Sequence, residues 1–226
     1  MKNKKNAYIF LYLFLINCVV MYHYTDVWGY RGVEQLVTSF DKEANHFSLF
    51  LLVLYMSIAV MFIYTIIKKT NDIFIMAKYI LPRSSKKKFM NLLLHEVGRS
   101  TIKLAGIKLI VDILFCIWID SNQLQWLLFL FFLYVTTFFM WGLIIILLAL
   151  FKIDKGVTQF IAITFVMILQ LLSYDNKFIS IFVVASINYR EDVLFLIASK
   201  ILLLLILFWY LRKTVYKYEI YGGEKV

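Results

Sequence analysis

Residues that break helices are scarce in this chain of 226 residues, which has 1 proline and 8 glycines. Linkers rich in glycine or proline are therefore absent, and nothing divides the chain into separate domains. Internal repeats are absent as well, which argues against a secondary transporter built from two inverted halves. We expect a single transmembrane domain over residues 1–226.

Motifs that support catalysis are also missing. The chain lacks GxxxxGK[ST], the loop that cradles nucleotide phosphates, so it cannot hydrolyse ATP by that route. It has neither HExxH nor GxSxG, and His23, His46 and His95 share no ligand spacing. Cys18 and Cys116 both fall in apolar stretches, where a thiol is more often a packing residue than half of a disulfide. We expect no enzyme activity, no metal site and no cofactor in this chain.

Long apolar stretches are what the chain has in abundance. Hydrophobic residues make up 62% of it, and six stretches approach the ~20 residues that a helix needs to cross ~30 Å of hydrocarbon. We place these spans at residues 7–24, 47–67, 101–119, 124–151, 157–174 and 193–211. The predicted fold class is all-α, a polytopic membrane protein with six transmembrane helices.

The basic residues are distributed unevenly among the loops. Most of the 24 lysines and arginines fall in the two terminal segments and in the second and fourth loops. The first, third and fifth loops hold only Arg31, Lys42, Lys177 and Arg190. Because basic residues are retained on the cytoplasmic side, we expect a multi-pass protein of the cell membrane with both termini cytoplasmic. The net charge of +10 then reflects topology and contact with membrane lipids, not a nucleic-acid partner.

The second loop, residues 68–100, is the longest polar segment and is predicted to lie in the cytoplasm. Within residues 71–81 the apolar side chains recur at the spacing of a short amphipathic helix. They are Ile73, Phe74, Met76, Ala77, Ile80 and Leu81. Pro82 should end this helix, and a second helix should begin near Lys86 and continue to Val97. Its first three residues are lysines, which we expect to face lipid phosphate or an acidic partner.

Two predicted outer loops also carry apolar residues. The spacing of apolar residues in 33–44 predicts a short helix on the outer leaflet. In the fifth loop, residues 178–187 are mostly apolar but too few to cross the membrane, which is typical of a re-entrant or interfacial segment. We expect Phe178, Ile181 and Ala185 to mark this segment.

Charged residues inside the predicted spans are rare and therefore informative. Asp112 and Lys200 lie at similar depths below the outer ends of their spans, so they could form an ion pair or line a substrate pathway. Lys108 stands four residues before Asp112, the spacing of a pair on one helix face, and is the alternative partner for the aspartate. The sequence leaves these interpretations open.

This layout resembles the membrane subunit of an ABC transporter of the ABC-2 exporter type. In that family the segment between spans two and three carries a coupling helix that seats in a groove of a separate ATPase subunit. The resemblance assigns that role to residues 71–81, followed by Pro82, Arg83 and two serines as the proline-containing turn. The implied docking residues are Ile73, Phe74, Ala77, Leu81 and Arg83. The resemblance also implies a second permease copy or a sister permease, and ATP and Mg bound by the partner ATPase.

The substrate is not specified by the sequence. A composition rich in Lys, Asn and Ile and poor in Gly and Pro is typical of an AT-rich Gram-positive genome. For a chain from such a genome, the resemblance implies export of amphipathic peptides such as bacteriocins or phenol-soluble modulins, or of lipid-like compounds. Two other classes stay open: the substrate-binding membrane subunit of a vitamin importer, and a membrane-embedded enzyme or immunity protein. Co-purification with an ATPase would separate the permease from both a membrane enzyme and an accessory protein.

Overall fold

The computed structural model describes residues 2–27, 40–41, 46–47, 49–80, 86–119, 124–151, 153–173, 178–183 and 193–217. These residues form six α-helices, one 3-10 helix and two short strands. In chain order they are α1 (Lys2–Val27), β1 (Phe40–Asp41), β2 (His46–Phe47), α2 (Leu49–Ile80), α3 (Lys86–Ile119), α4 (Leu124–Leu150), α5 (Lys155–Leu172), η3 (Ile179–Phe182) and α6 (Val193–Lys217). The predicted helical fold is confirmed.

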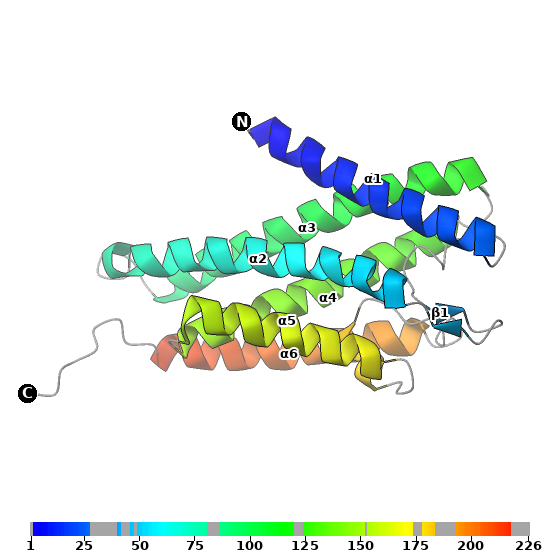
Figure 1. Ribbon diagram of the computed structural model, residues 1–226. Helices are drawn as coiled ribbons and strands as arrows, with labels where there is room; N and C mark the ends of the chain where they lie inside the picture. Colours follow the sequence, from blue (N-terminus) through cyan, green and yellow to red (C-terminus); the bar gives the residue numbers. More distant parts are fainter. Residues whose placement is uncertain are drawn as a thin grey trace, which may run out of the picture.

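Successive helices run in opposite directions along the bundle (Figure 1). The junctions from α2 to α3 and from α4 to α5, together with the last turn of α6, lie at one end, which we call the basic end. The strand pair, the junction from α3 to α4 and the start of α6 lie at the other. Asp154 fixes one of these turns, because its side chain accepts hydrogen bonds from the backbone N–H groups of Gly156 and Val157 and caps α5.

Helix α4 occupies the centre of the bundle. It packs against α2, α3, α5 and α6, whereas α1 packs mainly on α3. The span Leu127–Leu150 is 67% buried, against 22% for Lys155–Leu172 and 17% for Leu194–Lys217. α4 is therefore the core helix, and α5 and α6 expose most of their apolar surface.

The backbones of α3 and α4 approach closely at Gly142. A Cβ added there would lie 2.2 Å from Cγ1 of Val97. Small residues at such crossings allow membrane helices to pack by van der Waals contact.

Three helices are long and apolar enough to cross a membrane among the residues that the structure describes. They are Leu127–Leu150, Lys155–Leu172 and Leu194–Lys217, and a shorter apolar helix covers Asn6–Val20. On α5 and α6 the exposed side chains include Phe160 (71%), Leu205 (63%) and Trp209 (62%). Large apolar side chains exposed in this way suit a lipid environment. The other predicted spans, and the re-entrant segment, stay predictions.

Two boundaries differ from the sequence-based expectation. The predicted span 47–67 and the predicted helix 71–81 are one helix, α2, and the helix expected over 86–97 continues without a break through α3. The expectation of a separate short coupling helix was therefore wrong. Lys68, Lys69 and Thr70 are polar, but polarity alone does not end a helix, and no proline occurs before Pro82.

The strand pair is a second difference. Residues 40–41 pair antiparallel with residues 46–47, with Phe40 opposite Phe47, where the spacing of apolar residues predicted a helix. The remainder of that predicted helix lies outside the described residues. A local strand pair of this kind is not visible in a helical periodicity, because strand preference depends strongly on the surroundings of each side chain.

Candidate functional site: polar clusters in an apolar bundle

The first polar cluster lies between α1 and α3. Nζ of Lys108 donates hydrogen bonds to Oδ1 of Asp112 and, at 3.0 Å, to Oδ1 of Asn17. Nδ2 of Asn17 donates to the same Asp112 oxygen at 2.8 Å. All three side chains are buried, so each polar group stabilises the others in surroundings that cannot solvate it.

This cluster decides which partner Asp112 has. The ion pair joins Asp112 to Lys108, which lies one turn away on α3. This confirms the sequence-based alternative in which Lys108 is the partner of the aspartate. The alternative ion pair with Lys200 is not formed, because Lys200 binds other groups on α4 and η3. The matching depths of Asp112 and Lys200 were misleading because depth along a helix does not specify which face a side chain occupies.

The second cluster surrounds Lys200 on α6. Its Nζ donates to Oγ1 of Thr137 at 2.7 Å, to the carbonyl oxygen of Ile181 at 2.8 Å, and to that of Val183. Nε1 of Trp141 donates to the carbonyl of Phe182 at 3.0 Å. These contacts join α4 and α6 to the segment that contains η3.

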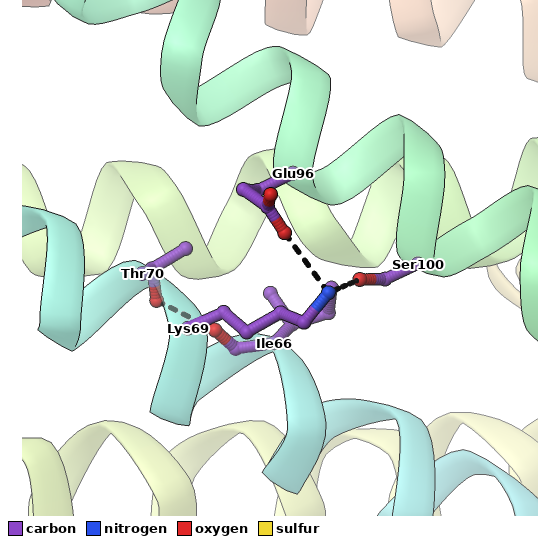
Figure 2. Close-up of polar contacts among 5 residues, drawn as sticks. All are labelled: Ile66, Lys69, Thr70, Glu96 and Ser100. Atoms are coloured by element: carbon purple, nitrogen blue, oxygen red, sulfur yellow. Dashed lines mark hydrogen bonds and ion pairs between the residues drawn. The ribbon is translucent and has the colours of Figure 1, made fainter. Parts of the chain in front are cut away.

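The third cluster joins α2 to α3 near the basic end (Figure 2). Nζ of Lys69 donates to Oε2 of Glu96 at 2.9 Å and to Oγ of Ser100 at 2.7 Å. The hydroxyl of Thr70 is turned back to the carbonyl of Ile66 on its own helix at 2.8 Å. The hydrogen bond from Lys69 lowers the pKa of Glu96, which precedes the predicted span on α3. Glu96 therefore stays charged at neutral pH.

The predicted docking residues on α2 lie in different surroundings. Ile73 and Ala77 are buried within the chain's own core, and the Phe74 ring lies edge-on to the Phe89 ring of α3, with 5.6 Å between their centroids. Ile73 and Ala77 are thus not accessible to a partner, because the chain itself covers them. Leu81 and Arg83 lie outside the described residues.

The apolar residues that are exposed near the end of α2 are not the predicted docking residues. Ile75 is 59% exposed and Met76 56% exposed, on the face of α2 turned away from α3. The amphipathic pattern did predict a helix with one apolar face. It could not show that the chain itself covers that face.

The fifth-loop residues are described only in part. Phe178 is exposed and Ile181 is half-buried, and Ala185 lies outside the described residues. Asn17 and Trp141 are among the cluster residues that reasoning from sequence missed. A lone asparagine in the apolar first span was the available signal for Asn17, whereas one tryptophan among many aromatic residues gave none.

Within the described ranges, no group of three or more His, Cys, Asp or Glu side chains is placed to hold a metal ion. Comparison with known proteins gives no match: no family model, no curated protein and no solved structure is similar to this chain. The functional argument therefore rests on the sequence and the structure of this chain.

Proposed function

We propose that this chain is the membrane-spanning permease subunit of an ATP-driven ABC exporter, with six transmembrane helices and both termini in the cytoplasm. The alternating helix directions support this topology, since they gather the α2–α3 and α4–α5 junctions and the end of α6 at one end (Figure 1). Those are the regions where most lysines and arginines occur. Retention of basic residues in the cytoplasm then orients the bundle.

The length of the α2–α3 hairpin is the observation that carries the proposal. With 32 and 34 residues, α2 and α3 are each about 50 Å long at ~1.5 Å per residue, well beyond the ~30 Å hydrocarbon core. In Figure 1 the last turns of α2 extend past the start of α5 and the end of α6. The hairpin thus offers a rigid element that projects from the membrane at the basic end.

Two apolar side chains on this projection suit a protein partner. Ile75 and Met76 are exposed on the part of α2 that lies beyond Lys68 and Lys69, where the chain leaves the hydrocarbon. Lipid would not cover them there, and burial against a partner is favourable at ~25 cal/mol per Å². We infer that they dock the ATPase, in place of the buried Ile73 and Ala77.

Co-purification tests the proposal. The tagged chain, extracted from its own cells in mild detergent, should bring down a protein identified by mass spectrometry as a Walker-type ATPase. The double variant Ile75→Ser, Met76→Ser should lose it, and the matched control Ile75→Leu, Met76→Leu should keep it. The variant Phe74→Asp is less informative, since it also breaks the contact with Phe89 inside the hairpin. Absence of any such ATPase from the wild-type sample would refute the proposal.

The substrate class is a finer part of the same proposal. Amphipathic peptides or lipid-like compounds partition into the bilayer and could enter a dimer of permeases from the side, through the apolar surface that α5 and α6 expose. Cells that lack the protein should then accumulate the substrate and become sensitive to it. Equal sensitivity of deleted and wild-type cells to a panel of such peptides would contradict this choice of substrate.

A further inference from the structure

The last residues of η3 and Val183, which follows them, lie against the apolar bundle. The last backbone carbonyls of a helix have no hydrogen-bond donor within the helix. In apolar surroundings other protein groups must supply the donors, because no water is there. The carbonyls of Ile181, Phe182 and Val183 are successive, and each accepts a hydrogen bond from a side chain of α4 or α6. Side chains thus replace the hydrogen bonds that a helix would have supplied.

Lys200 makes most of these contacts. An ammonium group has three N–H donors, and the oxygens of Thr137, Ile181 and Val183 accept one each. The lysine is completely buried, and neither ion pair found among the described residues includes it. All of its donors are used by the protein, so Lys200 is not a site for an anionic substrate in this conformation.

Two residues of α4 complete the arrangement. Thr137 and Trp141 stand one turn apart on the same face of that helix. The hydroxyl of Thr137 accepts from Lys200 and donates to the Val183 carbonyl at 3.2 Å, and Trp141 donates to Phe182. The segment is therefore held from two helices, and it also contacts α5 through η3.

We propose that Lys200, Thr137 and Trp141 form a latch that holds residues 181–183 in the bundle and closes the end of the bundle where α6 begins. Breaking the latch lets the segment swing out and exposes the side chain of Val183, which is 3% exposed when the latch is closed. The latch belongs to the folded chain itself. Only the further idea that it closes an export pathway rests on the proposed function.

Cysteine labelling of the purified chain in lipid nanodiscs, without ATP or any ATPase, tests the latch. The native thiols are first removed as Cys18→Ala and Cys116→Ala, and Val183→Cys then reports opening to a water-soluble maleimide. When opening is fast relative to labelling, the labelling rate follows the open fraction. Each hydrogen bond lost from a charged donor should raise that fraction roughly tenfold, so Lys200→Met should raise the rate at least about tenfold.

Further variants and a control position keep the test decisive. Trp141→Phe removes one hydrogen bond between neutral groups and should raise the rate roughly two- to tenfold. Thr137→Val removes one hydrogen bond from the charged Lys200 and one between neutral groups, and should raise the rate at least about tenfold. Met76→Cys, at a position that is 56% exposed and lies outside the hydrocarbon in the proposed topology, should label equally in every background. If Lys200→Met does not fold, the two α4 variants decide. Unchanged labelling of Val183→Cys in the folded variants would overturn the latch, whether or not an ATPase partner exists.

Discussion

Asp112 is a buried carboxylate whose partners, Lys108 and Asn17, come from two helices. Removing one member of such a set strands the others in surroundings that do not solvate them, which costs more than the pair itself contributes. The cluster therefore fixes how α1 sits on α3, and Asn17 gives the apolar part of α1 a specific docking position.

A double-mutant cycle measures this directly. Asp112→Asn and Lys108→Met should each lower the free energy of unfolding by about 3–5 kcal/mol, because each leaves a buried group unpaired. The double variant should recover part of the loss, with a coupling of about 0.5–3 kcal/mol. Unfolding in detergent gives the values. The matched control combines Asp112→Asn with Lys200→Met, and there the two losses of unfolding free energy should add. Coupling between Asp112 and Lys200, without coupling between Asp112 and Lys108, would contradict the structure.

Glu96 gives a pH-dependent contribution to stability. Its pKa is lowered, first by the hydrogen bond from Lys69, so the charged form is favoured in the folded chain. The stabilisation is then complete above the ordinary glutamate pKa of 4.5 and is lost as the pH falls through the lowered value. Because both side chains are partly exposed, the effect should be only about 0.2–1 kcal/mol.

A comparison of wild type with Glu96→Gln tests the direction of this pH dependence. The melting temperature should differ between pH 5 and 8 and converge below about pH 4, near the ordinary pKa of glutamate. In a Lys69→Met background the Glu96→Gln change should have little effect at any pH. A wild-type advantage that grows on acidification would be inconsistent with a lowered pKa.

Among the helices, the crossing of α3 and α4 at Gly142 is the tightest contact to test. Gly142→Ala places a methyl group against Val97, and such overpacking costs about 1–3 kcal/mol. Gly106→Ala on α3 is the matched control, because a Cβ there meets nothing within 4 Å. It should be neutral or stabilising by up to about 1 kcal/mol, since alanine favours helix. Equal thermal stability of the two variants would show that the helices are not so close.

Much of the helical pattern could be predicted from the sequence, because apolar length is a strong signal. The span expected at 124–151 corresponds to α4, the one at 193–211 to the first part of α6, and the helix start at Lys86 to that of α3. The continuity of α2 through Lys68 and Thr70 could not be predicted in this way. A polar residue ends an apolar run but does not end a helix. Hydropathy therefore underestimates the length of a helix that continues beyond its apolar part.

The clusters were less predictable than the helices. Charge inside a span pointed correctly to Lys108, Asp112 and Lys200 as unusual positions. Their partners depend on helix rotation and on tertiary contacts such as that of Trp141 with the Phe182 carbonyl, which no local pattern encodes. Likewise, the apolar face of residues 71–81 predicted contact with something, and only the fold shows that α3 is what covers Ile73 and Ala77.

For the molecule as a whole, the proposed topology places Met76 and Phe178 on opposite sides of the membrane, because α3, α4 and α5 lie between them. Both side chains are exposed. In intact cells of a chain without native thiols, an impermeant thiol reagent should label Phe178→Cys and should label Met76→Cys only after the cells are opened. Labelling of both from the outside would contradict three crossings between these positions.

The central claim, that the projecting hairpin couples this membrane bundle to an ATPase, is tested most directly by ATP hydrolysis in the purified complex. We expect the wild-type chain in nanodiscs, combined with the separately purified ATPase, to hydrolyse ATP faster when an amphipathic peptide is added. The variant Ile75→Ser, Met76→Ser, combined with the same amount of ATPase, should show no such stimulation while the bundle keeps its melting temperature. The Ile75→Leu, Met76→Leu control should behave as wild type. Full stimulation in the serine variant would contradict the claim.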